Sequence, residues 1–327
     1  MTTRRYSLFP IEYPDIWKLY CAQRDNFWRV EEITNLAADR EDWKKKMTDD
    51  ERAAAKQFLG FFNSSDQIVT ENILKNIIIY INIPEAQAFY AIQAAIEQIH
   101  SEAYSLMIES YMDDPDEKRE LFEALDRMPA IAKKGDWVLR WLNRKCTLGE
   151  RLVAFACVEG IFFSAAFAFI FWLGERNLLT SSYTLNKFIR RDEGLHMIFA
   201  CVLLNYVDTK PDKQTMEAII KESVEVELEF VRAALAKPLR GLNSTAMENY
   251  VRFVANHLCA NLDIKPIYTD QLECPLDFMR QIDLASKENF FEHNATNYSK
   301  SSMQSANLDM KKLFCDEKLD DTDDEKW

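Results

Sequence analysis

The residues best suited to chemistry in this sequence are two pairs of the form Glu-x-x-His, namely Glu97 with His100 and Glu193 with His196. The chain has 327 residues but only four histidines, and these pairs use two of them. In a helix, residues three apart lie on the same face, so each pair can direct a carboxylate and an imidazole at one point. One such pair is common by chance. Two pairs in a chain with so little histidine predict a metal site.

Two further acids extend this pattern. Asp66 precedes Glu97 by 31 residues and Glu159 precedes Glu193 by 34 residues, in each case on the preceding predicted helix. Ferritin-like dinuclear carboxylate proteins draw one acid from each of two helices and Glu-x-x-His from each of two others. We therefore predict an all-α fold, a ferritin-like helical bundle with a dinuclear metal site in its four-helix core.

This donor set has a chemical preference. Four carboxylates and two neutral imidazoles can balance and bridge two cations, and the mixture of oxygen and imidazole ligands suits iron or manganese. Without metal, four carboxylates in an apolar interior would be disfavoured by desolvation and by mutual repulsion. The alternative interpretation is a set of buried ion pairs with a structural role.

Helical periodicity predicts the elements that position these residues. The sequence Thr48-Asp49-Asp50-Glu51 has the form of a capping box, which marks a helix start, and Asp66 lies on the apolar stripe of that helix. Further helices are predicted over about 85–112, 148–175 and 183–206, with two or three more between about 211 and 260. Only seven glycines and nine prolines interrupt the chain, and no segment has the alternation of a strand.

One of these predicted helices is long and apolar enough to span a bilayer. Residues 152–173 are apolar apart from Glu159, Gly160 and Ser164. A glutamate near the middle of a span costs about 2.5–3.5 kcal/mol on insertion scales. A helix that is apolar on all sides also suits the centre of a large bundle. We therefore predict a buried core helix and no membrane association.

Composition narrows the range of partners and compartments. The net charge of −13 argues against nucleic acid, because phosphates are bound by basic patches. The seven cysteines are scattered, with no Cys-x-x-Cys pattern, which is typical of reduced thiols in a cytosolic protein. The first residues lack the apolar stretch of a signal peptide. These features together predict a cytoplasmic protein.

Tyr104 lies one helical turn after His100, so its phenol is expected close to the metals. Phe163 and Phe167 follow Glu159 by one and two turns, and Ile189 precedes Glu193 by one turn. These three side chains could form an apolar collar that protects an oxidised tyrosine, although ordinary core packing would give the same spacing.

Four segments carry a resemblance to a known family. They are residues 61–66 (Phe-Phe-Asn-Ser-Ser-Asp), 97–106 (Glu-Gln-Ile-His-Ser-Glu-Ala-Tyr-Ser-Leu), 158–164 (Val-Glu-Gly-Ile-Phe-Phe-Ser) and 191–196 (Arg-Asp-Glu-Gly-Leu-His). In this order they resemble the small, radical-generating subunit of class I ribonucleotide reductase, of the eukaryotic and viral type. The resemblance extends from about residue 11 to about residue 298.

The resemblance implies a role for each site residue. Two irons, which react with O2, would be held by Asp66, Glu97, His100, Glu159, Glu193 and His196. Tyr104 would become a stable tyrosyl radical. Trp17, Asp192 and His100 would form the hydrogen-bonded path by which the radical equivalent leaves. Tyr298 would relay it to the large catalytic subunit, which reduces ribonucleotides to deoxyribonucleotides.

The sequence also divides into three parts. Residues 1–47 are mixed in composition and are expected to be a partly irregular N-terminal segment packed on the bundle, 48–285 form the helical domain, and the polar residues 286–327 are expected to be a flexible tail. The resemblance implies that the protein is a homodimer and that the tail docks on the large subunit. Relatives usually end in a short acidic peptide with a terminal Phe. Here residues 316–327 hold seven acids and two lysines and finish with Trp327, so an altered docking contact is expected.

Two other functions are compatible with parts of this pattern. A dinuclear oxidase or iron-handling bundle without a large subunit would use the six ligands but leaves Trp17, Asp192 and the acidic aromatic tail without a role. A metal-free helical interaction protein would leave the ligand set itself without a role. The radical-generating subunit uses all of these features.

Overall fold

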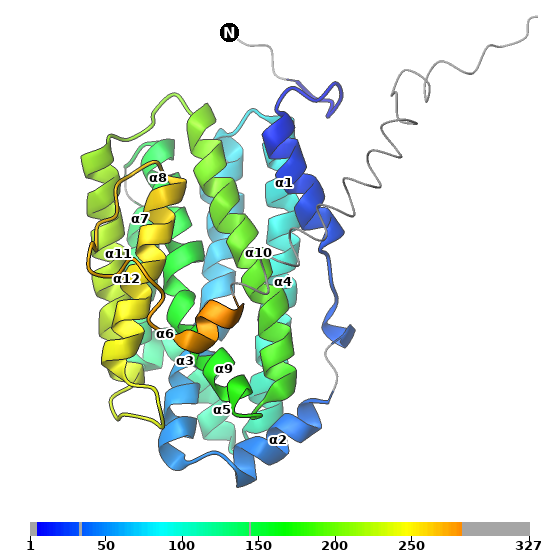
Figure 1. Cartoon of the computed structure of the whole chain (residues 1–327). Coiled ribbons are helices and arrows are strands. Elements are labelled where there is room, and N and C mark those ends of the chain that lie inside the picture. The colour runs from blue at the N-terminus through cyan, green and yellow to red at the C-terminus, as the bar shows by residue number, and fades with distance from the viewer. Residues whose placement is uncertain (1–4, 33–34, 144, 283–327) are drawn as a thin grey trace, which may run out of the picture. The chain divides into compact units, whose positions relative to one another are not determined.

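The computed structural model describes residues 5–32, 35–143 and 145–282, which form helices joined by short connections (Figure 1). The longer elements are α1 (Pro14–Asp25), α2 (Leu36–Lys45), α3 (Asp49–Asn72), α4 (Pro84–Tyr111), α5 (Pro115–Phe122), α7 (Pro129–Asn143), α8 (Leu148–Cys157), α9 (Ser164–Glu175), α10 (Thr180–Leu203), α11 (Lys213–Ala234) and α12 (Ser244–Asn261). The short helix α6 (Ala124–Arg127) precedes α7, and π-helical segments lie at Ile73–Ile77 and Val158–Phe162. Within the described ranges the only β pairing is an isolated bridge between Leu239 and Leu242, so the prediction of an all-α fold is confirmed.

Four helical rods surround the centre of the molecule. α3 packs along α4, and α10 packs along the rod that consists of α8, the π segment and α9. α4 also contacts α10, which closes the set of four. In Figure 1, α1 lies beside α4 and α10, whereas α11 and α12 lie on the opposite side of the bundle. The four rods correspond to the four helices predicted to carry the ligands.

The local sequence explains why α3 begins where it does. The Thr48 hydroxyl accepts a hydrogen bond from the backbone N–H of Glu51, and the Glu51 side chain accepts one from the backbone N–H of Thr48. This reciprocal arrangement is the predicted capping box, which satisfies two of the amides that a helix start leaves without partners. The stripe of Phe58, Phe62 and Val69 is buried, as predicted, and it carries Asp66 into the interior.

The rod from Leu148 to Glu175 is the predicted core helix. It has the length and hydropathy of a membrane span, but 94% of its apolar window is buried inside the structure. The predicted helix from Leu148 to Glu175 is confirmed, and within it α8 passes into a π-helical segment at Val158–Phe162 before α9 begins. In a helix that is apolar on all sides, hydrophobicity does not vary with the helical period. The sequence therefore could not show where the π-helical turn lies.

The N-terminal residues are more regular than expected. Two helices, α1 and α2, lie in the part of the chain that the sequence suggested was partly irregular. α1 starts with Pro14 at its first turn, a position where proline lacks only an amide that has no helical partner. It packs against α4 and α10 and so brings the following residues close to the ligand-bearing helices. The predicted tail, including Tyr298, lies outside the described residues.

Candidate metal centre

All six predicted ligands lie in the buried centre of the four rods. They are Asp66 on α3, Glu97 and His100 on α4, Glu159 in the π segment, and Glu193 and His196 on α10. Each is between 0 and 3% exposed. Four rods therefore bring four carboxylates and two imidazoles to one region from which water is excluded.

Two glutamates lie between the two imidazoles. Nδ1 of His100 is 3.3 Å from Oε2 of Glu97 and 3.1 Å from Oε1 of Glu193. Nδ1 of His196 is 3.0 Å from Oε1 of Glu97 and 3.1 Å from Oε2 of Glu193. Each carboxylate therefore presents one oxygen to each imidazole, which is the arrangement needed to bridge two metal ions.

The ligands form two groups that share a residue. Asp66, Glu97 and His100 offer ligand atoms within 4.8 Å of one another, and so do Glu97, Glu159, Glu193 and His196. Two sets of donors that have Glu97 in common fit a pair of ions better than one ion. The hard oxygens and the imidazole nitrogens match the ligand preferences of iron and manganese.

Unpaired polar atoms support the same conclusion. Every one of the six side chains has a buried atom without a hydrogen-bond partner, namely Oδ2 of Asp66, Oε2 of Glu97, Nδ1 of His100, Oε2 of Glu159, Oε1 of Glu193 and Nε2 of His196. A buried polar atom without a partner costs about 1–3 kcal/mol, and more when it is charged. The four carboxylates in this buried region each have such an oxygen, which would be unfavourable unless the oxygens bind something, and the residues present fit two metal ions.

The electrostatics of the acids follow from burial and crowding. Burial, followed by repulsion from Glu97, raises the pKa of Asp66 well above its ordinary value. Burial and repulsion from Glu193 do the same to the pKa of Glu159. Glu193 behaves differently: burial alone would raise its pKa, but the two imidazoles outweigh this and lower it. Among protein groups alone, burial and crowding therefore favour the protonated forms of Asp66 and Glu159.

The imidazoles respond to the same carboxylates. Burial alone would lower the pKa of His196, but the attraction of Glu97 and Glu193 raises it to about 9. Burial likewise opposes the charge on His100, while the neighbouring carboxylates of Asp192, Glu193 and Glu97 raise its pKa well above the ordinary value. The carboxylates thus favour the protonated form of both rings, and a protonated ring must lose a proton before it can bind metal.

Further polar side chains hold the ligands in place. Nε2 of Gln93 donates to Oε1 of Glu159 at 2.8 Å and to Oε1 of Glu97 at 3.4 Å. The hydroxyl of Ser65 donates to Oδ1 of Asp66 at 3.3 Å. Gln93 precedes Glu97 by one helical turn on α4, but helical spacing alone does not indicate that it would contact a carboxylate.

Asp192 links His100 to the N-terminal segment through Trp28. Its Oδ2 lies 3.3 Å from Nε2 of His100 and accepts a 2.7 Å hydrogen bond from the Trp28 indole, while Oδ1 accepts from Gln23 at 3.3 Å. A metal-binding histidine commonly donates its second ring nitrogen to a carboxylate in this way. Nδ1 of His100 is thereby left for the metal.

The assignment of Trp17 to this path was wrong. Trp17 is half-buried on α1 and stacks on Tyr20 with ring centroids 4.7 Å apart. The indole that reaches Asp192 belongs to Trp28, which is buried beyond the end of α1 and stacks over His100 at 5.9 Å. The resemblance pointed to Trp17, and helical spacing gave no signal for a tryptophan beyond the end of α1.

Tyr104 is completely buried next to the ligands. Its hydroxyl donates to Oδ1 of Asn186 at 3.2 Å, and its ring stacks on Phe62 with centroids 4.3 Å apart and planes at 7°. Phe163 and Phe167 pack on Phe62. Burial and the charge of Asp66 raise the pKa of Tyr104 well above its ordinary value.

The predicted collar therefore needs two additions. Phe62 makes the direct stacking contact with Tyr104, and its place four residues before Asp66 on one stripe was an available signal. Asn186 comes from α10, three residues before Ile189, and a polar residue on a buried face was the signal there. Ile189 is buried as expected.

The fold and the site together define a ferritin-like helical bundle with a dinuclear carboxylate–histidine centre. The family model described as ribonucleotide reductase, small chain, matches residues 5–275. The ribonucleoside-diphosphate reductase small chain of Variola virus is 44% identical over 301 residues, which cover 92% of this chain and 93% of the viral one. A ribonucleoside-diphosphate reductase small chain of Arabidopsis thaliana is 43% identical, over 93% of this chain and 91% of the plant one.

Solved structures agree with these relatives. The ribonucleotide reductase Rnr4 homodimer of Saccharomyces cerevisiae is similar with a TM-score of 0.72 and 33% identity, over 82% of this chain and 84% of that one. The ribonucleotide reductase R2 subunit of Clostridium botulinum has a TM-score of 0.74, covers 83% of this chain and 88% of its own, and at 23% identity supports the fold alone. This protein belongs to the ribonucleotide reductase small-chain family, whose members are oxidoreductases.

Proposed function

We propose that this protein generates and stores a tyrosyl radical at Tyr104 and supplies it to a large catalytic subunit that reduces ribonucleoside diphosphates. The observation that carries the proposal is the position of a fully buried tyrosine, one helical turn from His100, beside a six-ligand site built for two metal ions. When two irons are bound there, reaction with O2 would supply the oxidant that removes one electron from Tyr104.

The surroundings of Tyr104 are suited to this role. Its hydroxyl donates to the neutral amide of Asn186, which cannot hold the proton released on oxidation. Asp66, one of the six proposed ligands, is the charged group with the strongest effect on the Tyr104 pKa. The rings of Phe62, Phe163 and Phe167 keep the remaining sides of this region dry.

Asp192 and Trp28 provide a route out of the site. The path from His100 through Asp192 to Trp28 is continuous in hydrogen bonds and completely buried. We propose that the radical equivalent leaves along it. Tyr298 and the acidic tail, which lie outside the described residues, would complete the route and dock on the large subunit.

Iron is the metal we propose, with manganese as the alternative, since carboxylates and imidazoles accept both. A relative from Streptococcus sanguinis is described as dimanganese(II)-NrdF. The active form is proposed to be a homodimer, as named for the yeast relative. A cytoplasmic location is supported by the free thiols of the six cysteines in the described residues.

The experiment is reconstitution with Fe(II) and O2, followed by metal analysis and EPR. Wild-type protein should bind two irons per chain and give a tyrosyl doublet with a sharp visible absorption. Tyr104→Phe should bind the same iron and give neither signal. It should also fail to support deoxyribonucleotide formation with a large subunit. A wild-type protein with two irons and no radical after O2 would reject the proposal.

A further inference from the structure

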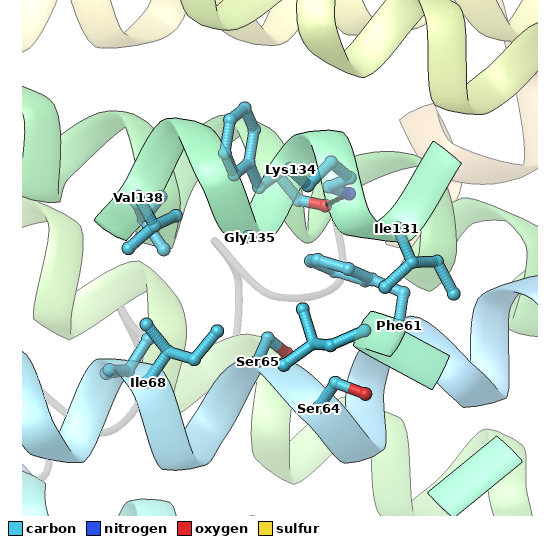
Figure 2. A pocket seen from close by; sticks show the side chains of 12 residues that line it. Phe61, Ser64, Ser65, Ile68, Ile131, Lys134, Gly135 and Val138 are labelled. Carbon is cyan, nitrogen blue, oxygen red and sulfur yellow. Dashed lines mark hydrogen bonds between the residues drawn. The ribbon is translucent and has the colours of Figure 1, made fainter. Parts of the chain in front are cut away.

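A buried lysine on α7 lies behind the metal centre. Lys134 is 1% exposed, and Figure 2 shows it with Phe61 among the residues that line a small cavity beside α3. Its Nζ lies 3.2 Å from the centroid of the Phe61 ring and 4.2 Å from that of Phe230. The cavity has a volume of about 20 Å³, room for about one water. Bulk solvent is therefore excluded from this ammonium group.

Two protein groups take the place of water. Nζ of Lys134 lies 2.6 Å from Oε2 of Glu227 on α11, and both side chains are buried. Nζ also donates a 2.7 Å hydrogen bond to the carbonyl of Phe162. The lysine thus connects three elements, α7, α11 and the rod that carries Glu159.

The carbonyl of Phe162 is not an arbitrary acceptor. Phe162 is the last residue of the π segment, Val158–Phe162, and Glu159 is the second residue of that segment. A π turn departs from the regular pattern of hydrogen bonds and is less stable than an α-helical turn, so such turns persist where other contacts hold them. Lys134 supplies such a contact at the end of the turn.

Charge pairing alone would not require this arrangement. Burial lowers the pKa of Lys134 to about 8 and raises that of Glu227 to about 7, so the pair is costly to keep inside. Apolar side chains of similar size often serve stability as well or better. One reason to retain the pair is that it places Nζ of Lys134 where it donates a hydrogen bond to the carbonyl of Phe162.

We propose that Lys134 is a positioning residue, which fixes the π segment through the Phe162 carbonyl and thereby holds Glu159 in its ligating position. The inference rests on the proposed metal centre. Partners behind metal ligands typically change metal affinity by about 10- to 100-fold when they are removed. We expect an effect of this size on one of the two ions, the one that Glu159 binds.

The molecule offers a matched control. Lys133 and Glu229 also join α7 to α11, but both side chains are more than half exposed. The double variant Lys134→Met/Glu227→Leu removes the buried pair and the donor, and Lys133→Met/Glu229→Leu removes the exposed pair by the same substitutions. Glu227→Gln is a third variant, which removes the charge pair and leaves Lys134 able to donate to Phe162 whether or not its amine is protonated.

Two measurements test the inference on full-length protein. The first is equilibrium binding of Mn²⁺ to protein stripped by chelation. The buried double variant should bind one ion about 10- to 100-fold more weakly than wild type, whereas the exposed double variant and Glu227→Gln should bind both ions like wild type. The second is hydrogen exchange of the amides at 158–162 in stripped protein, which should be faster in the buried double variant alone.

The outcomes separate this inference from the proposed function. Wild-type affinity and wild-type exchange in the buried double variant would overturn the role of Lys134. Loss of affinity in Glu227→Gln equal to that in the double variant would assign the effect to the charge pair and would also overturn it. Failure of wild-type protein to bind two Mn²⁺ ions would instead refute the metal centre, while the exchange measurement would still report on Lys134.

Discussion

Loading the chelator-stripped protein with Mn²⁺ at pH 7 should release at least about one proton per chain, that of His196, whose pKa is raised to about 9. Burial and crowding raise the pKa values of Asp66 and Glu159, which favours the neutral form of each acid among protein groups alone. The surrounding carboxylates raise the pKa of His100 as well. Metal binds carboxylates and neutral imidazoles, so the two ions must displace the protons that these groups hold.

The sign of the pH dependence follows from the same shifts. The pKa of His196 is raised to about 9 from 6.5, so its contribution to the stability of the stripped protein is present below pH 6.5 and is lost as the pH rises through 9. Raised carboxyl pKa values act in the same direction, because the folded state then holds protons that the unfolded state has lost. The stripped protein should be less stable at pH 9 than at pH 7. Overall metal affinity should rise with pH, by about tenfold per unit for each proton displaced.

Titration calorimetry in buffers of different ionisation enthalpy measures the number of protons directly. The slope of the observed enthalpy against the buffer ionisation enthalpy should correspond to a release of at least about one proton for two ions. Glu97→Gln, which alters the ligand shared by both groups, should weaken both binding events. A slope that shows no proton release, or a metal affinity that does not change between pH 6 and 8, would refute this account of the site.

Three further predictions concern single side chains. Trp28→Phe should leave the tyrosyl radical intact but lower turnover with the large subunit by at least about tenfold. A decrease of this size is expected from the loss of one buried hydrogen bond to a charged group. Trp17→Phe should keep a turnover near that of wild type in the same assay. Asn186→Leu leaves a buried phenol without its acceptor and should cost about 1–3 kcal/mol in urea unfolding, with an altered EPR spectrum of the radical; an unchanged spectrum would contradict the contact. Gly174→Ala should lower the free energy of unfolding by about 1–3 kcal/mol, because the new Cβ would lie 2.1 Å from the Tyr183 ring. At Gly194 a new Cβ meets nothing within 4 Å, so Gly194→Ala should raise the free energy of unfolding by about 0.5–1 kcal/mol.

The ligands could be predicted from the sequence because the spacing of residues along a helix determines which face each side chain lies on. Asp66 could be assigned because it interrupts an apolar stripe whose phase was set by Phe58, Phe62 and Val69. The capping box at Thr48 fixed where that stripe begins. Wherever one regular helix carried the information, the prediction and the structure agree.

The errors lie where the chain leaves a regular helix. Trp28 follows the end of α1, where no helical period relates a residue to a direction in space. The role of partner to Asp192 was therefore assigned to Trp17, which lies within the helix. The π segment at Val158–Phe162 was invisible because its rod is apolar on every side. Lys134 and Asn186 act across helices, and contacts between helices depend on packing that spacing in one helix does not contain.

The most direct test of the central claim is anomalous diffraction from crystals of the Mn²⁺-loaded protein. Two peaks should lie between α3, α4, α10 and the π segment, contacted by the six side chains, with Glu97 next to both peaks. A single peak, peaks at surface carboxylates, or two buried peaks without Asp66 and Glu159 as ligands would contradict the account.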